Sequence, residues 1–270
     1  MKSISMPSAP SRASRRTSSM SERAYVVQGS LEEAADVVVF LPPAGSVTSP
    51  YLPIGSRLPA TLPAVHCEIP GRGRLVHDEA PASVHSAVGR WAGELAALLP
   101  GRRLHVFGHS LGALFAYELT ALFEARPDGG AEVATLLVSG SREPGSAPRS
   151  LVVHAFAALR QEQRAADREG DAEGALLLED LRMRREHRTA GRRLRAPLAL
   201  FCGHTDAFAR PAEMLEWKRF TGGPFLGMFT FGGGHDYYLS GRQEIAAAIS
   251  GIVNRHPNSN SEDLGVRNDG

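Results

Sequence analysis

The sequence predicts an α/β fold with a mostly parallel central sheet, helices on both faces and a helical insertion. Short apolar runs bounded by glycine or proline are predicted strands, at residues 37–41, 64–69, 104–107, 135–138, 198–202 and 227–231. Continuous apolar runs are typical of strands covered on both faces. Longer segments with helical spacing lie among them, at 83–99, 111–125, 210–220 and 241–255. This alternation favours crossover helices and therefore a parallel sheet.

One segment interrupts the alternation of strands and helices. Residues 150–194 contain two or more helix-like stretches with no strand between them, and their apolar side chains are interleaved with charges. A helical insertion above a sheet uses such residues to line a cavity. We therefore predict a lid at about 150–194. The alternative is a helical pair packed on the surface of the core.

Composition restricts the class of protein. The chain has 270 residues, 43% of them hydrophobic and 22% charged, and a formal net charge of +1. These values suit a globular protein and give no electrostatic reason to expect nucleic acid or a membrane as partner. Cys67 and Cys202 lie in or beside predicted strands, so we expect buried free thiols. Because no secretory signal or membrane-spanning run is apparent, we expect a cytoplasmic location.

The two ends of the chain differ in composition from the middle. Residues 1–23 are rich in serine, arginine and proline, and residues 257–270 are rich in asparagine, serine and glycine. Such segments bury too little apolar surface to offset the entropy of ordering. We expect disordered tails at 1–23 and 257–270, and one folded domain at 24–256.

A Gly-x-Ser-x-Gly motif lies between a predicted strand and a predicted helix, at Gly108-His109-Ser110-Leu111-Gly112. Glycines on both sides allow a bend too tight for side chains with a Cβ, and the bend holds the serine hydroxyl clear of the backbone. The motif therefore predicts Ser110 as a nucleophile. The alternative is an ordinary turn with an inert serine.

The candidate base is His235, which follows the last predicted strand and three consecutive glycines. A glycine run lets a loop approach another backbone and present the next side chain. Asp206, after the preceding strand, is the candidate carboxylate that fixes the imidazole tautomer. The chain order Ser110, Asp206, His235 is that of α/β-hydrolases. Asp180 and Asp236 are weaker candidates for the acid.

The tetrahedral intermediate of such a reaction needs backbone N–H donors. Leu111 follows the nucleophile, and Ala44 lies in the loop 42–46 after the first long strand, where neither proline can donate. We predict these two N–H groups as the oxyanion hole. An ordinary proline and glycine turn is the alternative interpretation of the loop.

The sequence does not predict a metal or a cofactor. Histidine and aspartate at 204–206 and 235–236 offer ligand types, but their spacing matches no common zinc pattern. The remaining histidines show no partner pattern and are expected to be structural or exposed: His66, His77, His85, His105, His109, His154, His187 and His256.

The chain resembles the discrete type II thioesterases that accompany polyketide synthases and nonribosomal peptide synthetases, over nearly all of residues 37–252. The resemblance rests on the motif at 108–112 and on five further sequences: Pro70-Gly71-Arg72, Ala116-Tyr117-Glu118-Leu119, Ser139-Gly140-Ser141, Trp217 with Thr221, and Gly233-Gly234-His235. It implies hydrolysis of acyl groups held as thioesters on the phosphopantetheine arm of acyl or peptidyl carrier proteins, which clears stalled or wrongly primed units. It also implies a monomer with no cofactor of its own, whose lid covers the acyl chamber.

The chain departs from the pattern of this family at several positions. Pro43 stands where the family has histidine, Ile54 where it has an aromatic residue, and Asp236 where it has phenylalanine. The segment 181–184 lacks the family's Arg-Ala-Asp. These changes leave the predicted triad intact and put substrate preference in doubt. A carboxylesterase with the same triad, or an inactive hydrolase fold that binds synthetases, are the competing hypotheses.

Overall fold

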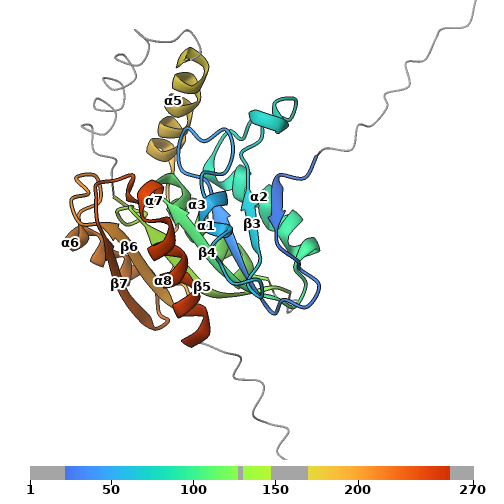
Figure 1. Cartoon of the computed structure of the whole chain (residues 1–270). Coiled ribbons are helices and arrows are strands. Elements are labelled where there is room, and N and C mark those ends of the chain that lie inside the picture. The colour runs from blue at the N-terminus through green and yellow to red at the C-terminus, as the bar shows by residue number, and fades with distance from the viewer. Residues whose placement is uncertain (1–21, 127–129, 147–169, 256–270) are drawn as a thin grey trace, which may run out of the picture.

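The computed structural model describes residues 22–126, 130–146 and 170–255 (Figure 1). Within these ranges the strands form one sheet in the order β1-β3-β2-β4-β5-β6-β7. β1 pairs antiparallel with β3, and every other neighbouring pair is parallel. The strands are β1 (Tyr25–Gln28), β2 (Asp36–Leu41), β3 (Ala64–Cys67), β4 (Arg103–His109), β5 (Glu132–Ser139), β6 (Leu198–Gly203) and β7 (Phe225–Phe231). The predicted α/β fold with a mostly parallel sheet is confirmed.

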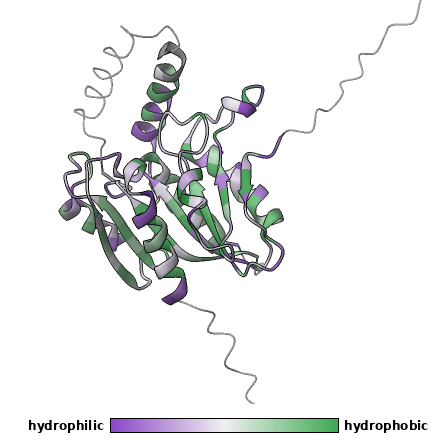
Figure 2. Ribbon diagram, viewed as in Figure 1, coloured by the Kyte–Doolittle hydropathy of each residue, from purple (hydrophilic) through white to green (hydrophobic). Residues whose placement is uncertain are grey.

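Helices cover both faces of the sheet. One face is covered by α2 (Val84–Leu98), α3 (Leu111–Glu124), α6 (Pro211–Met214) and the 3₁₀ helix η2 (Leu215–Phe220), and the other by α1 (Leu52–Gly55), α7 (Tyr237–Ser240) and α8 (Arg242–Arg255). Side chains of β2 alternate between the two apolar clusters, because successive residues of a strand point to opposite faces. Figure 2 shows the apolar colouring along the strands that this double coverage requires.

The best-formed helix on the first face is α2. Ser83 caps its N-terminus by accepting a hydrogen bond from the Ser86 N–H at 3.1 Å, while the Ser86 hydroxyl accepts one from the Ser83 N–H at 3.0 Å. Such caps contribute about 1 kcal/mol. Trp91 packs edge to face on Phe115 of α3, with ring centroids 5.1 Å apart, and locks the two helices together.

One strand was not predicted, one predicted helix differs from the structure, and the predicted lid is described only in part. β1 went unpredicted because an edge strand that is only partly buried has no continuous apolar run. The predicted helix at 210–220 is instead the short α6 followed by η2. Of the predicted lid, α5 (Gly170–Glu186) is described, whereas residues 147–169 lie outside the described residues, as do nearly all of the predicted tails.

The remaining compositional expectations concern thiols and membranes. Cys67 and Cys202 are free and buried, as predicted, and burial raises the pKa of both thiols. In the part of the chain that the structure describes, no helix is both long and apolar enough to cross a bilayer.

α5 rises above the edge of the sheet where the parallel strands end (Figure 1). It packs against α3, and its Asp180 contacts the loops that follow β2 and β3. Side chains at the carboxyl ends of several strands therefore lie beneath one helix. Ligands of open α/β sheets bind at this edge.

Candidate active site

The turn between β4 and α3 holds Ser110 in a strained conformation. Its φ of 56° and ψ of −113° make it the one non-glycine residue with positive φ in the described ranges. A Cβ on Gly108 would lie 1.9 Å from the Gly112 carbonyl oxygen, and one on Gly112 would lie 2.4 Å from that of Leu41. Both glycines are therefore needed for the turn. Strain of this kind costs on the order of 1–3 kcal/mol and is concentrated at functional sites.

His235 and Asp206 meet above the ends of β6 and β7. The His235 Nδ1 lies 2.9 Å from Asp206 Oδ2, and both side chains are largely buried. The other carboxylate oxygen accepts hydrogen bonds from the N–H groups of Phe208 at 2.8 Å and Ala209 at 3.1 Å. Both oxygens are thus held in place, and the imidazole is oriented so that Nε2 is left for the reaction.

The glycine run before His235 has the close backbone contact that the sequence predicts. A Cβ on Gly203, at the end of β6, would lie 2.1 Å from the carbonyl oxygen of Gly234. The loop that carries Asp206 and the loop that carries His235 therefore touch through glycine backbones. This contact brings the two side chains within hydrogen-bond distance.

His109 has a place that the sequence did not predict. Its ring lies 4.5 Å from that of His235 and 4.6 Å from that of Tyr238, and its Nδ1 lies 2.8 Å from Ser139 Oγ. Burial, and then the charge of His235, hold its pKa well below 6.5, so the ring is neutral. His109, the residue directly before Ser110, therefore packs against the candidate base. Its position inside the motif was the signal.

The two predicted oxyanion donors lie at the same end of neighbouring strands. Leu41 of β2 pairs with Gly108 of β4, so the loop 42–46 and the turn at Ser110 are adjacent. Leu111 is the first residue of α3, where backbone N–H groups lack intrahelical partners and the helix dipole favours negative charge. Ala44 precedes Gly45, whose N–H donates to Asp180 Oδ2 at 2.7 Å.

Asp180 forms a buried ion pair with Arg72. The Arg72 guanidinium donates to both carboxylate oxygens, at 2.8 and 2.9 Å, and the side chains are 3% and 0% exposed. Because both oxygens of this carboxylate accept hydrogen bonds from Arg72, and one also accepts from Gly45, Asp180 is not placed to orient His235. It instead fastens α5 to the loop that carries Ala44. Arg72 thereby gives a physical reason for the Pro70-Gly71-Arg72 sequence.

The other sequences that carried the resemblance are structural. Trp217 Nε1 donates to the Ser141 carbonyl at 2.7 Å, and the Tyr117 hydroxyl donates to that of Arg192 at 2.7 Å. Thr221 Oγ1 donates to the Ala196 carbonyl at 2.9 Å. The first bond ties η2 to the loop after β5, and the other two tie the segment between α5 and β6 to α3 and to the end of η2.

Two of the remaining histidines lie close together in the structure. His85 and His187 share Glu118 as a neighbour. In the described ranges these three residues form a group of possible metal ligands whose ligand atoms lie within 4.8 Å of one another. They come from α2, α3 and the end of α5, so sequence spacing could not reveal them. Asp236, in contrast, is exposed at the start of α7, and the carboxylate within hydrogen-bond distance of His235 Nδ1 is that of Asp206.

A strained serine between a strand and a helix, with an aspartate and a histidine at the ends of later parallel strands, defines an α/β-hydrolase. Residues 37–253 match the family model described as Thioesterase domain, and the chain belongs to this family. It is a thioester hydrolase, which confirms the predicted class of enzyme.

Individual relatives indicate which branch of the thioesterase family the chain resembles. The chain is 30% identical over 229 residues to thioesterase PikA5 of Streptomyces venezuelae, covering 79% of each. The type II thioesterase BorB from the borrelidin biosynthetic cluster superposes with a TM-score of 0.72 at 25% identity, over 86% of this chain and 98% of that one. YbtT, a type II thioesterase from the yersiniabactin NRPS/PKS pathway, superposes with a TM-score of 0.69 at 25% identity, over 84% of this chain and 96% of that one. The predicted resemblance to type II thioesterases is confirmed.

Proposed function

We propose that this thioesterase hydrolyses acyl groups from the phosphopantetheine arm of acyl or peptidyl carrier proteins, and so clears stalled or wrongly primed synthetases. The observation that carries the proposal is the Asp206–His235 hydrogen bond of 2.9 Å at the same sheet edge as the strained Ser110. The resemblance to type II thioesterases of such pathways supports the choice of substrate. The cytoplasm is the proposed location.

The proposed reaction begins at Ser110. Its Oγ attacks the thioester carbonyl carbon while His235 Nε2 accepts the hydroxyl proton, and Asp206 stabilises the imidazolium that forms. The carbonyl oxygen becomes an oxyanion that accepts hydrogen bonds from the N–H groups of Leu111 and Ala44. The C–S bond then breaks, and the imidazolium returns its proton to the pantetheine sulfur. The products of this half-reaction are a free carrier thiol and an acyl-serine.

Water completes the proposed cycle. His235 accepts a proton from water, whose oxygen attacks the acyl-serine carbonyl and forms a second tetrahedral intermediate. Collapse of this intermediate breaks the bond to Ser110 Oγ, which takes the proton back from His235. The carboxylic acid leaves, and the enzyme returns to its starting state. His109 supports this cycle by holding a neutral ring against His235, so that no second positive charge opposes the imidazolium.

The proposed lid is anchored at its described end. Asp180 joins α5 to Arg72 and to the Gly45 N–H, so the helix is fixed above the oxyanion loop. A lid held in this way excludes water from the acyl chain and keeps the thioester close to Ser110. The chain-length preference would then depend on apolar residues of the segment 150–194.

We propose that the carrier protein docks near the end of α5. Exposed arginines gather in this segment and just after it: Arg182, Arg185, Arg188, Arg192, Arg193 and Arg195. Carrier proteins are usually acidic, and complementary charge accelerates encounter more than it strengthens the final complex. Replacing Arg182, Arg185 and Arg188 by glutamate should therefore raise KM for carrier-bound substrate while leaving turnover of a small free thioester unchanged.

The substrate proposal is tested with a panel of acyl-loaded carrier proteins, followed by mass spectrometry of the carriers. We expect the enzyme to deacylate them many times faster than it hydrolyses the matching simple oxygen esters. Faster hydrolysis of the free oxygen esters would instead identify a carboxylesterase. Failure of a fluorophosphonate to label Ser110, combined with no turnover, would identify an inactive binding module.

A further inference from the structure

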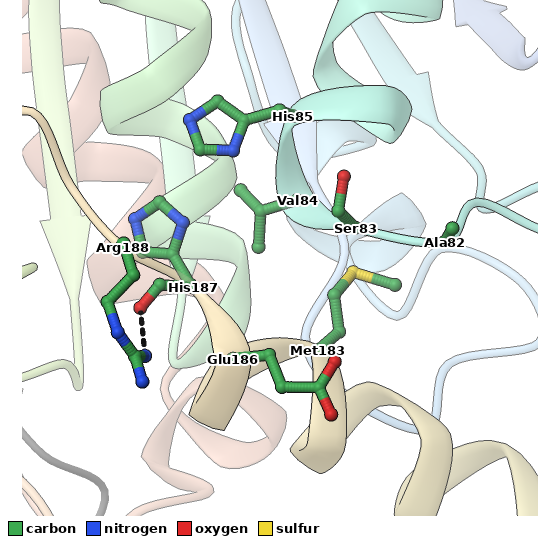
Figure 3. Close-up of a pocket in the computed structure, with 8 residues that line it drawn as sticks. All are labelled: Ala82, Ser83, Val84, His85, Met183, Glu186, His187 and Arg188. Atoms are coloured by element: carbon green, nitrogen blue, oxygen red, sulfur yellow. Dashed lines mark hydrogen bonds between the residues drawn. The ribbon is translucent and has the colours of Figure 1, made fainter.

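A second cluster of ionisable side chains lies beside α5, apart from the candidate active site. His85 comes from the first turn of α2, Glu118 from the middle of α3, and His187 from the position directly after α5. His187 Nε2 is 3.2 Å from Glu118 Oε1, and His85 Nε2 is 3.6 Å from Glu118 Oε2. In Figure 3 the two imidazole rings lie one above the other, on α2 and on the chain that leaves α5. Their ring centroids are 5.3 Å apart.

The polar atoms of this cluster lack the hydrogen bonds that buried groups normally have. The His187 side chain is only 1% exposed, yet neither of its ring nitrogens forms a hydrogen bond with another described residue. Glu118 Oε1 is also buried without one, so its 3.2 Å approach to His187 Nε2 has the distance but not the angle of a hydrogen bond. Leaving such groups unsatisfied costs about 1–3 kcal/mol each, and a bound ion is one explanation.

The three side chains form a known type of ligand set. Two imidazoles and one carboxylate are the protein ligands of one class of four-coordinate zinc site, in which water holds the fourth position. Bonds of about 2.0–2.2 Å in tetrahedral geometry separate neighbouring ligand atoms by roughly 3.3 Å. His187 Nε2 lies 3.2 Å from Glu118 Oε1 and His85 Nε2 lies 3.6 Å from Glu118 Oε2, so each imidazole is near this separation from one carboxylate oxygen. The ligand atoms of the three residues all lie within 4.8 Å of one another.

A pocket gives the cluster access to solvent. It has a volume of about 180 Å³ and is lined by His85, His187, Met183 and neighbouring residues (Figure 3). The His85 side chain is 59% exposed, so a metal and its water could exchange through this side. Arg188 also lines the pocket, but its guanidinium donates to the carbonyl oxygens of Arg185 and His187. Glu186 lines the same pocket.

We infer that His85, Glu118 and His187 bind a divalent transition metal of the zinc class, which ties the end of α5 to α2 and α3. The metal takes one imidazole nitrogen from each histidine and an oxygen from Glu118, and binding releases any proton that the histidines carry. Because α3 begins at Leu111 and α5 carries Asp180, the ion would fix the base of the proposed lid on the helix that starts at the nucleophile.

The test uses the full chain without a histidine tag, stripped of metal by a chelator. Co²⁺ titration followed by visible absorption, and Zn²⁺ titration by calorimetry, should show one equivalent bound with the bands of a four-coordinate site. His85→Ala, Glu118→Gln and His187→Ala should each weaken Zn²⁺ affinity by about 100-fold or more, since even outer-shell changes cost 10–100-fold. The matched control is His77→Ala, an exposed histidine outside the cluster, which should bind as the wild type does.

His85→Ala is the decisive variant because its side chain is exposed and its removal leaves no cavity. Absence of Zn²⁺ binding by the wild type, or binding that His85→Ala and Glu118→Gln leave unchanged, overturns the site. In hydrogen exchange, Zn²⁺ should slow exchange at the C-terminal turn of α5 in the wild type and not in His85→Ala. Unchanged exchange in the metal-loaded wild type overturns the link to α5.

Discussion

Two buried carboxylates, Asp206 and Asp180, lie at the same edge of the sheet and have different partners. Both side chains are 0% exposed, and both accept backbone N–H groups as well as one cationic or titratable side chain. Asp206 faces His235, the imidazole that we propose as the base of the reaction. Asp180 faces Arg72, whose guanidinium is always charged. The chemical nature of the partner, and not the burial of the acid, therefore separates the acid that we propose for catalysis from the acid that fixes α5.

The largest effect should follow loss of the nucleophile or base. We expect Ser110→Ala and His235→Ala each to lower kcat for carrier-bound thioesters by about 10⁶-fold, because triad members act as a unit. Neither residue belongs to the apolar clusters of the core, so circular dichroism should stay close to wild type. Substantial turnover in either variant would contradict the proposed roles.

Asp206→Asn should lower kcat by about 10³–10⁴-fold, because an amide no longer enforces the required imidazole tautomer. The measurement is steady-state hydrolysis of a carrier-bound thioester. Asp236→Asn is the matched control, since this carboxylate is exposed and lies next to the same histidine. An active Asp206→Asn together with an inactive Asp236→Asn would reverse the assignment of the acid.

Asp180→Ala should mainly reduce stability. It leaves the buried Arg72 charge without its partner, and breaking a buried pair lowers the unfolding free energy by about 3–5 kcal/mol. The Gly45 N–H also loses its acceptor, so we expect kcat to fall by roughly 10-fold through displacement of the Ala44 donor. Urea titration and steady-state kinetics measure the two effects.

The comparison between the two acids would fail if Asp180→Ala lost as much turnover as Asp206→Asn at unchanged stability. Arg72→Lys separates charge from geometry in the same pair. It keeps the positive charge and loses the paired hydrogen bonds at 2.8 and 2.9 Å, so it should fall between wild type and Asp180→Ala in stability.

The smallest effect concerns the pH dependence of stability and two buried histidines. Burial lowers the pKa of His66 from 6.5 to about 4, so the folded state keeps this ring neutral while the unfolded chain takes up a proton below 6.5. Its contribution to stability is therefore full above pH 6.5 and is lost as the pH falls from 6.5 towards 4. Burial of His109 acts in the same direction. Urea titrations over this range should show a shallower decline in unfolding free energy for His66→Gln than for wild type.

Much of the fold could be predicted because its signals are local. The strands β2 and β6 contain continuous apolar runs, and Ser110 lies in a turn that its two glycines make sterically possible. The candidates Asp206 and His235 follow from their places after successive strands. Local patterning of this kind reports burial and turns without any knowledge of tertiary contacts.

The remaining features depend on how separate elements dock. The Arg72–Asp180 pair joins residues 108 positions apart, and the cluster of His85, Glu118 and His187 forms only when α5 packs beside α2 and α3. Nothing in the spacing of such residues encodes their meeting. The role of His109 was missed for the same reason, because its contacts with His235 and Tyr238 come from the far end of the chain.

We propose that Ser110 carries the acyl group between the carrier thiol and water. Intact-protein and peptide mass spectrometry of the enzyme, quenched during incubation with an acyl-loaded carrier, tests this claim directly. We predict the mass of the acyl group on the peptide that contains Ser110 in the wild type, and no such adduct with Ser110→Ala. Deacylation of the carrier by Ser110→Ala at the wild-type rate would contradict this role of Ser110.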